Sequence, residues 1–481
     1  THCTSSAASD VYKRQTLNTS TEDGVIKNSM ASEEAKEYFK LATPMLLTQL
    51  AAHATGIISA LMTGNYNTVD QAAVAIGNML FWPAYFGIAG VLFIVTSFVA
   101  QFYGARQIAQ IGPIVKQSYW LAIPLILLFV IYTLNADSLL NILGTPEEVK
   151  TITKDYLFGL MIGAPAMFLF QPLRSMCEGM KKPLPITYIN VVMVLINALV
   201  NYVLIFGKFG FPELGGKGCG IAFLISSWSS LLIILGYIYF SNFFKEIRFF
   251  ENFEAPNPKQ IAEIIKLGVP IGGTLFIEIA VFSGAGLILS SLGENVISAH
   301  AIAMQVTTLT FMLPLSIGLA ANVRVGNLVG SNSLDRARYS SFFAMFFALF
   351  LAIINTFVLI EFGNYLASFF NPDIEIVNLA ATLLIIAAIF QIADGLNFAG
   401  VGALRGFKDT QILFFFMFIA YWIIGMPIGY TLSMTDFFSD PIGAPGMWIG
   451  LTVGLFVSAA FVIARVNYTT GRGRSRFVLN S

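Results

Sequence analysis

Long apolar stretches recur along almost the whole chain, and they limit what it can fold into. A stretch of about 20 apolar residues is long enough to cross a bilayer as a helix. Of the 481 residues, 56% are hydrophobic and only 11% are charged. This balance excludes a water-soluble globular domain and predicts an all-α polytopic membrane protein. Twelve spans are expected, at roughly 41–63, 71–100, 114–136, 154–176, 184–206, 219–241, 262–291, 295–328, 339–362, 377–403, 411–434 and 444–466.

A polar, largely charged segment divides the spans six and six. Residues 1–15 do not begin with Met and are expected to be a remnant of cloning or sequencing. The polar stretch before the first span has no apolar core, so no signal peptide is expected. The predicted organisation is an N-terminal segment at 16–40, an N-lobe at 41–241, a linker at 242–261, a C-lobe at 262–467 and a tail at 468–481.

The basic residues are distributed unequally between the two sides of the predicted spans. Of the 27 Lys and Arg, two lie in the expected remnant, and 21 of the other 25 fall on the side that carries both termini. The remaining four, on the other side, are Lys150, Lys154, Lys208 and Lys217. Because cytoplasmic loops carry the excess of Lys and Arg, both termini are predicted to be cytoplasmic.

The two halves of the chain resemble each other. VAQFYGA at Val99–Ala105, at the end of span 2, matches VGNLVGS at Val325–Ser331, at the end of span 8. At nearly the same separation along the chain, LRSMCEG after span 4 is paired with LRGFKDT after span 10, and GGKGCG before span 6 echoes GAPGMW before span 12. Six spans are an even number, so both halves keep the same topology. A duplication of this kind predicts two pseudo-symmetric lobes related by an axis along the membrane normal.

Two spans each carry a single acid near their middle. Glu278 and Asp394 have no other charged residue within ten positions on either side. At about 1.5 Å per residue, Glu278 lies roughly 18 Å from Lys266, and Asp394 lies roughly 17 Å from Arg405. Both basic residues belong to the same predicted face, so the two acids are expected at similar depth. An acid inside a membrane is a functional hypothesis by default, and a hydrogen-bonded structural acid is the alternative.

Other polar residues within the spans are weaker candidates. They are expected to line a cavity, although hydrogen bonding between helices explains each equally well: Gln49, Gln305, Gln391 and Asn397. His53 could titrate near neutral pH, but packing or a single hydrogen bond is the better interpretation. His300 is expected to cap a helix end.

Several functional classes are disfavoured by composition. The three cysteines have neither disulfide nor metal-binding spacing, and the three histidines form no cluster, so a metal enzyme is not expected. The formal net charge is zero, which gives no electrostatic footprint for nucleic acid.

Ordered motifs between about residues 41 and 467 resemble the multidrug and toxic compound extrusion (MATE) family, in its NorM-like bacterial branch. They include LATPMLLTQLA, QPLRSMCEGM, GKFGFPELGGKGCGIA, LGVPIGGTLFIEIAVF, PLSIGLAANVRVGNLVG and QIADGLNFAGVGALRGFKDT. The resemblance implies a two-lobed antiporter, not an enzyme, that exports organic compounds and takes up Na⁺ or H⁺ without another cofactor. It also implies that Glu278 and Asp394 couple transport to the cation, with Na⁺ a candidate ligand of this pair.

One departure from the family concerns span 1, where an aspartate is usual and this chain has Ser59 in GIISALMTGN. Related branches join that aspartate to polar residues of span 5 in an N-lobe cation site. Here span 5 offers Asn197 and Asn201, one helical turn apart on one face. A neutral set binds cations weakly, so coupling is expected in the C-lobe.

The predicted function is therefore export of drug-like compounds, expected to be cationic, by a lipid-embedded monomer of the bacterial inner membrane. A lipid-linked oligosaccharide flippase is the alternative within transport, but it would need a basic cavity, and no Lys or Arg falls deep in any predicted span. An intramembrane enzyme is less consistent, since Asp394 stands in ADGL without a GxGD arrangement. No loop resembles a channel selectivity filter.

Overall fold

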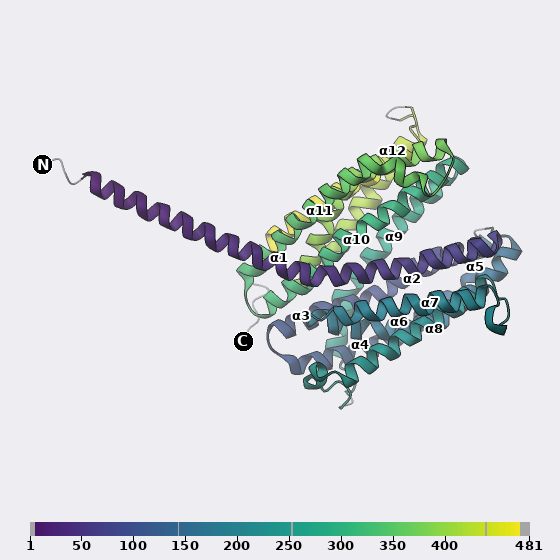
Figure 1. The fold of residues 1–481 in the computed structure, drawn as a ribbon, viewed down its shortest axis with the longest axis horizontal. Helices are drawn as coiled ribbons and strands as arrows, with labels where there is room; N and C mark the ends of the chain where they lie inside the picture. Colours follow the sequence, from purple (N-terminus) through teal and green to yellow (C-terminus); the bar gives the residue numbers. More distant parts are fainter. Residues whose placement is uncertain (1–4, 143, 252–253, 438–439, 472–481) are drawn as a thin grey trace.

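The computed structural model describes the chain except residues 1–4, 143, 252–253, 438–439 and 472–481, and the secondary structure in the described part is helical (Figure 1). The elements are α1 (Ser5–Tyr66), α2 (Thr68–Ala89), η1 (Gly90–Ile94), α3 (Val95–Gly104), η2 (Ile108–Gln110), α4 (Ile111–Leu134), α5 (Ala136–Ile142), α6 (Glu147–Gly179), α7 (Leu184–Ile205), η3 (Lys208–Gly210), α8 (Gly216–Phe240), η4 (Asn242–Ile247), α9 (Pro258–Ser290), α10 (Glu294–Gly330), α11 (Leu334–Ser368), α12 (Ile374–Gly406), α13 (Gln411–Met417), η5 (Phe418–Gly425), α14 (Met426–Met434) and α15 (Ala444–Thr470).

The predicted spans are confirmed. In the described part of the chain, twelve helices or continuous helical runs are long and apolar enough to cross a membrane. Spans 2, 3 and 11 are composite. Span 2 consists of α2, η1 and α3, span 3 of η2 and α4, and span 11 of α13, η5 and α14. Of the expected remnant at 1–15, residues 1–4 lie outside the described part, and α1 begins at Ser5. The expected tail at 468–481 lies outside the described part from residue 472 on.

Two large apolar cores define two lobes, and spans 1 and 7 contribute to both lobes. The N-lobe core comes from α2 to α8, and it also contains Ile264 and Ile271 from the first turns of α9. The C-lobe core comes from α9 to α15, and it also contains Tyr38 and Met45 from α1. Tyr38 and Ile264 are equivalent positions of the internal repeat, as are Met45 and Ile271. Each lobe therefore packs the beginning of the other lobe's first span.

The turns that follow equivalent spans show the same symmetry. Arg106 and Asn332, which follow spans 2 and 8, have φ of 59° and 55°. Lys181 and Lys408, which follow spans 4 and 10, have φ of 59° and 61°. Aligning these left-handed residues leaves the paired LRSMCEG and LRGFKDT motifs out of register by about one helical turn, so that pairing was wrong. The two motifs were paired because both begin with Leu-Arg, which is a chance similarity. The residues with left-handed backbone show how the two halves of the chain align.

A symmetric set of contacts, which we term the inter-lobe clasp, joins the lobes where spans 2, 4, 8 and 10 end. Gln101 Nε2 of α3 donates to the Gly406 carbonyl oxygen at 2.9 Å. Asn327 Nδ2 of α10 donates to the Gly179 carbonyl oxygen at 3.2 Å. The two bonds are related by the internal repeat, so each lobe supplies one amide to the backbone of the other. Figure 1 shows the lobes meeting on this side and diverging away from it.

Two glycines let the clasp backbones touch. A Cβ on Gly104 would overlap the Asn327 carbonyl, and a Cβ on Gly330 would overlap the Gln101 carbonyl. Gly104 and Gly330 occupy the same position in the matching VAQFYGA and VGNLVGS motifs, so this close approach is repeated on both sides of the symmetry axis. The clasp consists of Gln101, Gly104, Gly179, Asn327, Gly330 and Gly406.

Ion pairs reinforce the same side of the molecule. Arg324 of α10 binds Glu34 of α1 through two hydrogen bonds of 2.5 and 3.0 Å, and both side chains are buried. Ser340 of α11 donates a further bond to Glu34 at 2.9 Å. Lys181, at the end of α6, pairs with Glu37 at 2.9 Å. The part of α1 in which the first span begins therefore connects the C-lobe helices to the end of an N-lobe span.

Lys408 crosses between the lobes as well, and it gives a pH prediction. Its Nζ lies 3.7 Å from the ring centroid of Phe98 in α3. Burial lowers the pKa of Lys408 from 10.5 to about 8. Between these pKa values the unfolded chain binds more protons than the folded one, so folding stability contributed by this group rises with pH. From pH 8 to pH 10, parent protein in detergent is expected to gain about 1–3 °C in Tm relative to Lys408→Met.

Thermal unfolding followed at several pH values measures this difference. Lys182→Met is a matched control, since Lys182 also lies over a phenylalanine ring, Phe243, but is exposed. Parallel pH curves for the parent and Lys408→Met would contradict the prediction.

Candidate functional site

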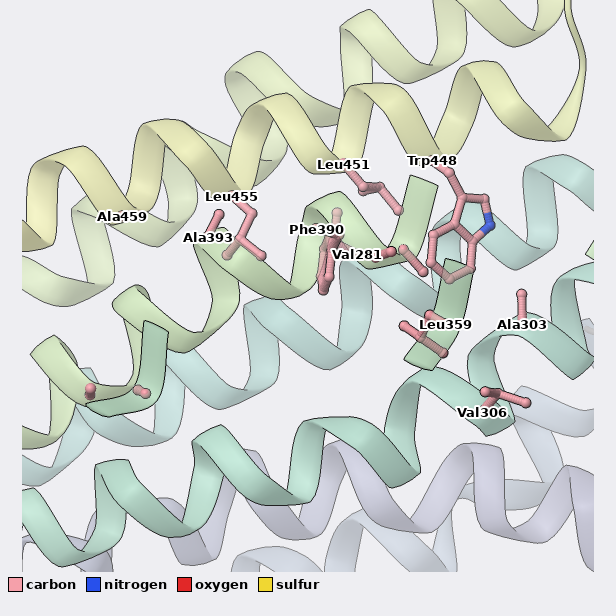
Figure 2. Packing of buried hydrophobic residues seen from close by; sticks show 14 of the residues in the cluster. Val281, Ala303, Val306, Leu359, Phe390, Ala393, Trp448, Leu451, Leu455 and Ala459 are labelled. Carbon is pink, nitrogen blue, oxygen red and sulfur yellow. The ribbon is translucent and has the colours of Figure 1, made fainter. Parts of the chain in front are cut away.

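Glu278 and Asp394 lie near the middle of α9 and α12, and ring contacts place them at one level. Phe282 follows Glu278 by one turn, and Phe390 precedes Asp394 by one turn. Their ring centroids are 5.9 Å apart. Because α9 and α12 cross in opposite directions, both rings lie on the same side of the acids. Figure 2 shows Phe390 beside Val281 of α9. The similar depth inferred from sequence agrees with this packing.

The two carboxylates share one electrostatic environment. Asp394 is 2% exposed, and Glu278 is partly buried. Electrostatic interactions link Asp394 to Glu278 and link Glu278 to Arg405. In the described part of the chain, no three His, Cys, Asp or Glu side chains are grouped to hold a metal ion. Glu278 and Asp394 are the residues that could hold a cation, with neutral oxygens completing its coordination.

Arg405 reaches further into the lobe than its sequence position suggests. It lies in the last turn of α12, and no basic residue was expected deep in a span. Helical side chains point toward the N-terminus of their helix, so an arginine at this end extends back toward the two acids. Its Nε is buried and has no hydrogen-bond partner. The site therefore contains one positive charge that residue counting along the helix missed. Arg174, in the other LR pair, instead binds Glu178 at 2.7 Å.

Gln391 and Asn397 are brought close to Asp394, three residues to either side on α12. Ser458 Oγ donates to Asn397 Oδ1 at 3.0 Å. Gln391 Nε2 donates to Thr310 Oγ1 at 2.8 Å, while Gln391 Oε1 is buried without a partner. Both predicted cavity residues therefore hydrogen-bond to neighbouring helices, and Gln391 retains one free acceptor.

Tyr421 is a second residue at this site that sequence reasoning missed. It is fully buried, and within the described part of the chain its hydroxyl has no hydrogen-bond partner. The hydroxyl interacts electrostatically with both Glu278 and Asp394. In the sequence Tyr421 stands in the apolar run FFFMFIAYWIIG, where nothing distinguishes it from a lipid-facing or packing aromatic. Only the helix geometry of span 11 identifies its direction.

The N-lobe candidates form one hydrogen-bonded set. Asn201 Nδ2 donates to Ser59 Oγ at 3.0 Å and to Asn197 Oδ1 at 2.9 Å. Asn197 Nδ2 in turn donates to Ser226 Oγ at 3.4 Å. Asn201 Oδ1 is buried and has no partner. The three predicted residues are together, as the family resemblance implied, and the set carries no charge.

The remaining candidates hydrogen-bond to side chains other than the two carboxylates. Gln49 Oε1 accepts a hydrogen bond from Arg174 at 3.3 Å. Gln305 of α10 hydrogen-bonds to His53 of α1 at 3.1 Å through the two Nε2 atoms, which agrees with a single hydrogen bond for His53. The expectation for His300 was wrong. This side chain is buried and accepts a hydrogen bond at Nδ1 from Trp448 Nε1 at 3.1 Å, so it joins two helices and caps none.

Comparison with known proteins settles the family. The MatE family model matches residues 44–203 and again 270–431, once in each half. The chain belongs to the MatE family. Multidrug resistance protein MdtK of Yersinia pseudotuberculosis serotype O:1b (strain IP 31758) is 34% identical over 438 residues, which cover 90% of this chain and 95% of that protein. MdtK of Yersinia enterocolitica serotype O:8 is 34% identical over 439 residues, with the same coverage.

Solved structures of MATE transporters share the fold. The eukaryotic MATE transporter AtDTX14 superposes with a TM-score of 0.82 at 21% identity, covering 93% of this chain and all of that one. An outward-facing multidrug resistance MATE family transporter of the MOP superfamily gives a TM-score of 0.82 at 18% identity, covering 93% of this chain and 97% of that one. As a MatE protein, this chain is a twelve-helix, two-lobed membrane protein.

Proposed function

We propose that this MatE protein is a multidrug exporter that exchanges organic compounds, chiefly cations, for Na⁺ or H⁺ at Glu278 and Asp394. One observation carries the proposal: the two isolated membrane acids lie at one level of the C-lobe, within a family fold whose MdtK relatives are named for multidrug resistance. Two acids kept in an apolar lobe are costly, and such residues mark ion and substrate pathways.

Competition at this pair of carboxylates is sufficient for antiport. Ionised, the two groups hold Na⁺ or an organic cation, and protonated, they release it. A ligand drives the switch between two states only through its different affinity for them. One charge moving inward through 100 mV supplies about 2.3 kcal/mol, so one or two cations support a drug gradient of about 50-fold to about 2,000-fold.

We infer that the protein acts as a monomer in the bacterial inner membrane with both termini in the cytoplasm. The excess of Lys and Arg at one set of span ends supports this orientation. In this orientation the inter-lobe clasp and the Glu34–Arg324 pair lie at the cytoplasmic ends of the spans. The clasp would then oppose access from the cytoplasm while the coupling site loads from outside.

Ethidium efflux from drug-sensitive bacterial cells tests the proposal. Cells that produce the protein are expected to extrude the dye faster than vector-only cells, and an imposed Na⁺ or pH gradient is expected to sustain efflux after metabolic energy is removed. The gradient that does so names the coupling ion. Dye retention equal to that of vector-only cells under both gradients would refute the proposal.

The N-lobe set gives a separate prediction. Ser59→Ala removes one acceptor of Asn201 Nδ2, which keeps its bond to Asn197 Oδ1. Because no charge is changed and the Asn201 amide keeps one of its two hydrogen bonds, efflux is expected to stay within about twofold of the parent. The concentration of coupling cation at half-maximal efflux is also expected to be unchanged. A clear shift of that concentration would show that the N-lobe takes part in coupling.

A further inference from the structure

The helix of span 11 changes its geometry at the level of the coupling site. Between α13 and α14, the segment Phe418–Gly425 is a π-helix, a rare form that is frequent at functional sites. Tyr421 lies inside this segment. A residue in a π turn is rotated relative to its place in a continuous α-helix, so the segment decides where the Tyr421 side chain points.

The buried face of span 11 explains why a π turn is needed. Apart from Ala420, its buried positions recur every four residues, at Leu413, Met417, Tyr421, Gly425, Gly429 and Ser433. An α-helix has 3.6 residues per turn, so a four-residue repeat drifts by roughly 40° at each step. Five steps would carry the stripe onto the opposite face. The wider π turn, with its i→i+5 bonds, compensates for this drift and keeps Tyr421 facing the lobe interior.

Two contacts fix Tyr421 at the height of the acids. The neighbouring Trp422 donates from Nε1 to the carbonyl oxygen of Ile277 at 3.5 Å, and Ile277 directly precedes Glu278. The ring of Tyr421 lies edge-on to Phe282, with centroids 6.3 Å apart. Span 11 is thus held against the two turns of α9 that carry Glu278 and Phe282.

The hydroxyl of Tyr421 is a buried polar group with no hydrogen-bond partner among the residues that the structure describes. Such a group is costly in an apolar interior and needs an explanation at each occurrence. Tyr421 is 0% exposed, and its hydroxyl interacts electrostatically with both acids. A phenol can donate its proton to a carboxylate and can offer its oxygen to a cation. A carboxylate and a cation are the two groups that an ion site of this kind contains.

We propose that the Tyr421 hydroxyl is the third protein oxygen of the coupling-cation site, beside the carboxylates of Glu278 and Asp394. The assignment rests on the proposed function, and it adds a neutral ligand to the two acids. With a cation bound, the phenol oxygen faces the ion. When the cation leaves, the hydroxyl turns its proton toward a carboxylate and stabilises the charged, empty site. Tyr421 thereby sets how tightly the coupling cation is held.

If Tyr421 had only a structural role, its ring would fill space and its hydroxyl would not matter. Tyr421→Phe keeps the ring and removes only the oxygen, so it separates this role from that of a cation ligand. The variant is therefore tested in the ethidium efflux assay by titrating the coupling cation. Its half-saturating cation concentration is expected to shift about tenfold from that of the parent. The matched control is Tyr430→Phe, which removes a hydroxyl from a 46% exposed tyrosine of the same span and is expected to shift it less than twofold.

The outcomes separate the two proposals. If Glu278→Gln abolishes efflux but Tyr421→Phe keeps the parent's half-saturating concentration, the function stands and the role of Tyr421 is refuted, whatever the maximal rate. If Glu278→Gln exports like the parent, the site is refuted and Tyr421 with it. If Tyr421→Phe does not accumulate in the membrane, Trp422→Phe decides. That variant loosens the π segment from Ile277. A shift of about two- to fivefold in the half-saturating cation concentration would support the assignment of Tyr421. An unchanged half-saturating concentration would refute it.

Discussion

Cells that produce Glu278→Gln or Asp394→Asn are expected to extrude ethidium no faster than vector-only cells. Each replacement keeps the size and shape of the side chain but removes its negative charge. The amide can neither bind a cation by charge nor take up and release a proton. Removing one partner of a buried charge pair, here a carboxylate that holds the coupling cation, typically costs about 2–5 kcal/mol of binding, which corresponds to a loss of about 30-fold to about 4,000-fold. The initial rate of efflux, normalised to the amount of protein in the membrane, is the measurement.

Two further variants show whether the loss is specific to these carboxylates. Glu278→Asp keeps the charge and is expected to retain measurable efflux. Glu361→Gln neutralises an exposed acid of α11 and is expected to export like the parent. Normal export by both Glu278→Gln and Asp394→Asn would mean that the two acids hold helices together and that the coupling site lies elsewhere.

The spans and the depth of the acids could be predicted because both follow from one-dimensional properties of the chain. Hydropathy identifies stretches that must be helical in a bilayer, since a lipid-embedded backbone has to satisfy its own hydrogen bonds. The helical rise then converts residue counts into depth. The contact between Phe282 and Phe390 bears out that conversion for Glu278 and Asp394.

Features that depend on side-chain direction or on irregular helix geometry could not be predicted in this way. Arg405 was placed at a span end, although its long side chain extends back toward the acids. Tyr421 faces the site because a π turn adjusts the rotation of span 11, and no composition signal marks that turn. Tyr38 packs in the C-lobe core and Ile264 packs in the N-lobe core, each in the lobe opposite to its own span. This arrangement likewise depends on packing between segments that are distant in the sequence.

Gly104→Leu and Gly330→Leu are expected to reduce efflux by more than about tenfold while leaving each lobe folded. At both positions a side chain would overlap a backbone carbonyl of the opposite lobe, and backbone cannot move aside as a flexible side chain can. Forcing extra atoms into a close-packed contact typically costs about 1–3 kcal/mol, and here the strain is relieved by separating the lobes. An exporter that cannot close the clasp loses one of the two states between which it must alternate, so turnover stops although the carboxylates are intact.

A disulfide reports clasp closure independently of transport. Ser97 Oγ of α3 lies 2.8 Å from Asn322 Oδ1 of α10, so cysteines at these two positions would bridge the lobes only when the clasp is closed. Ser97→Cys with Asn322→Cys is expected to cross-link readily, and adding Gly330→Leu is expected to suppress the cross-link. Gly236→Leu is the matched control, because a Cβ at Gly236 of α8 meets no atom within 4 Å. Rapid cross-linking in the presence of Gly330→Leu would show that the clasp tolerates the added side chain, and any loss of efflux would then need another cause.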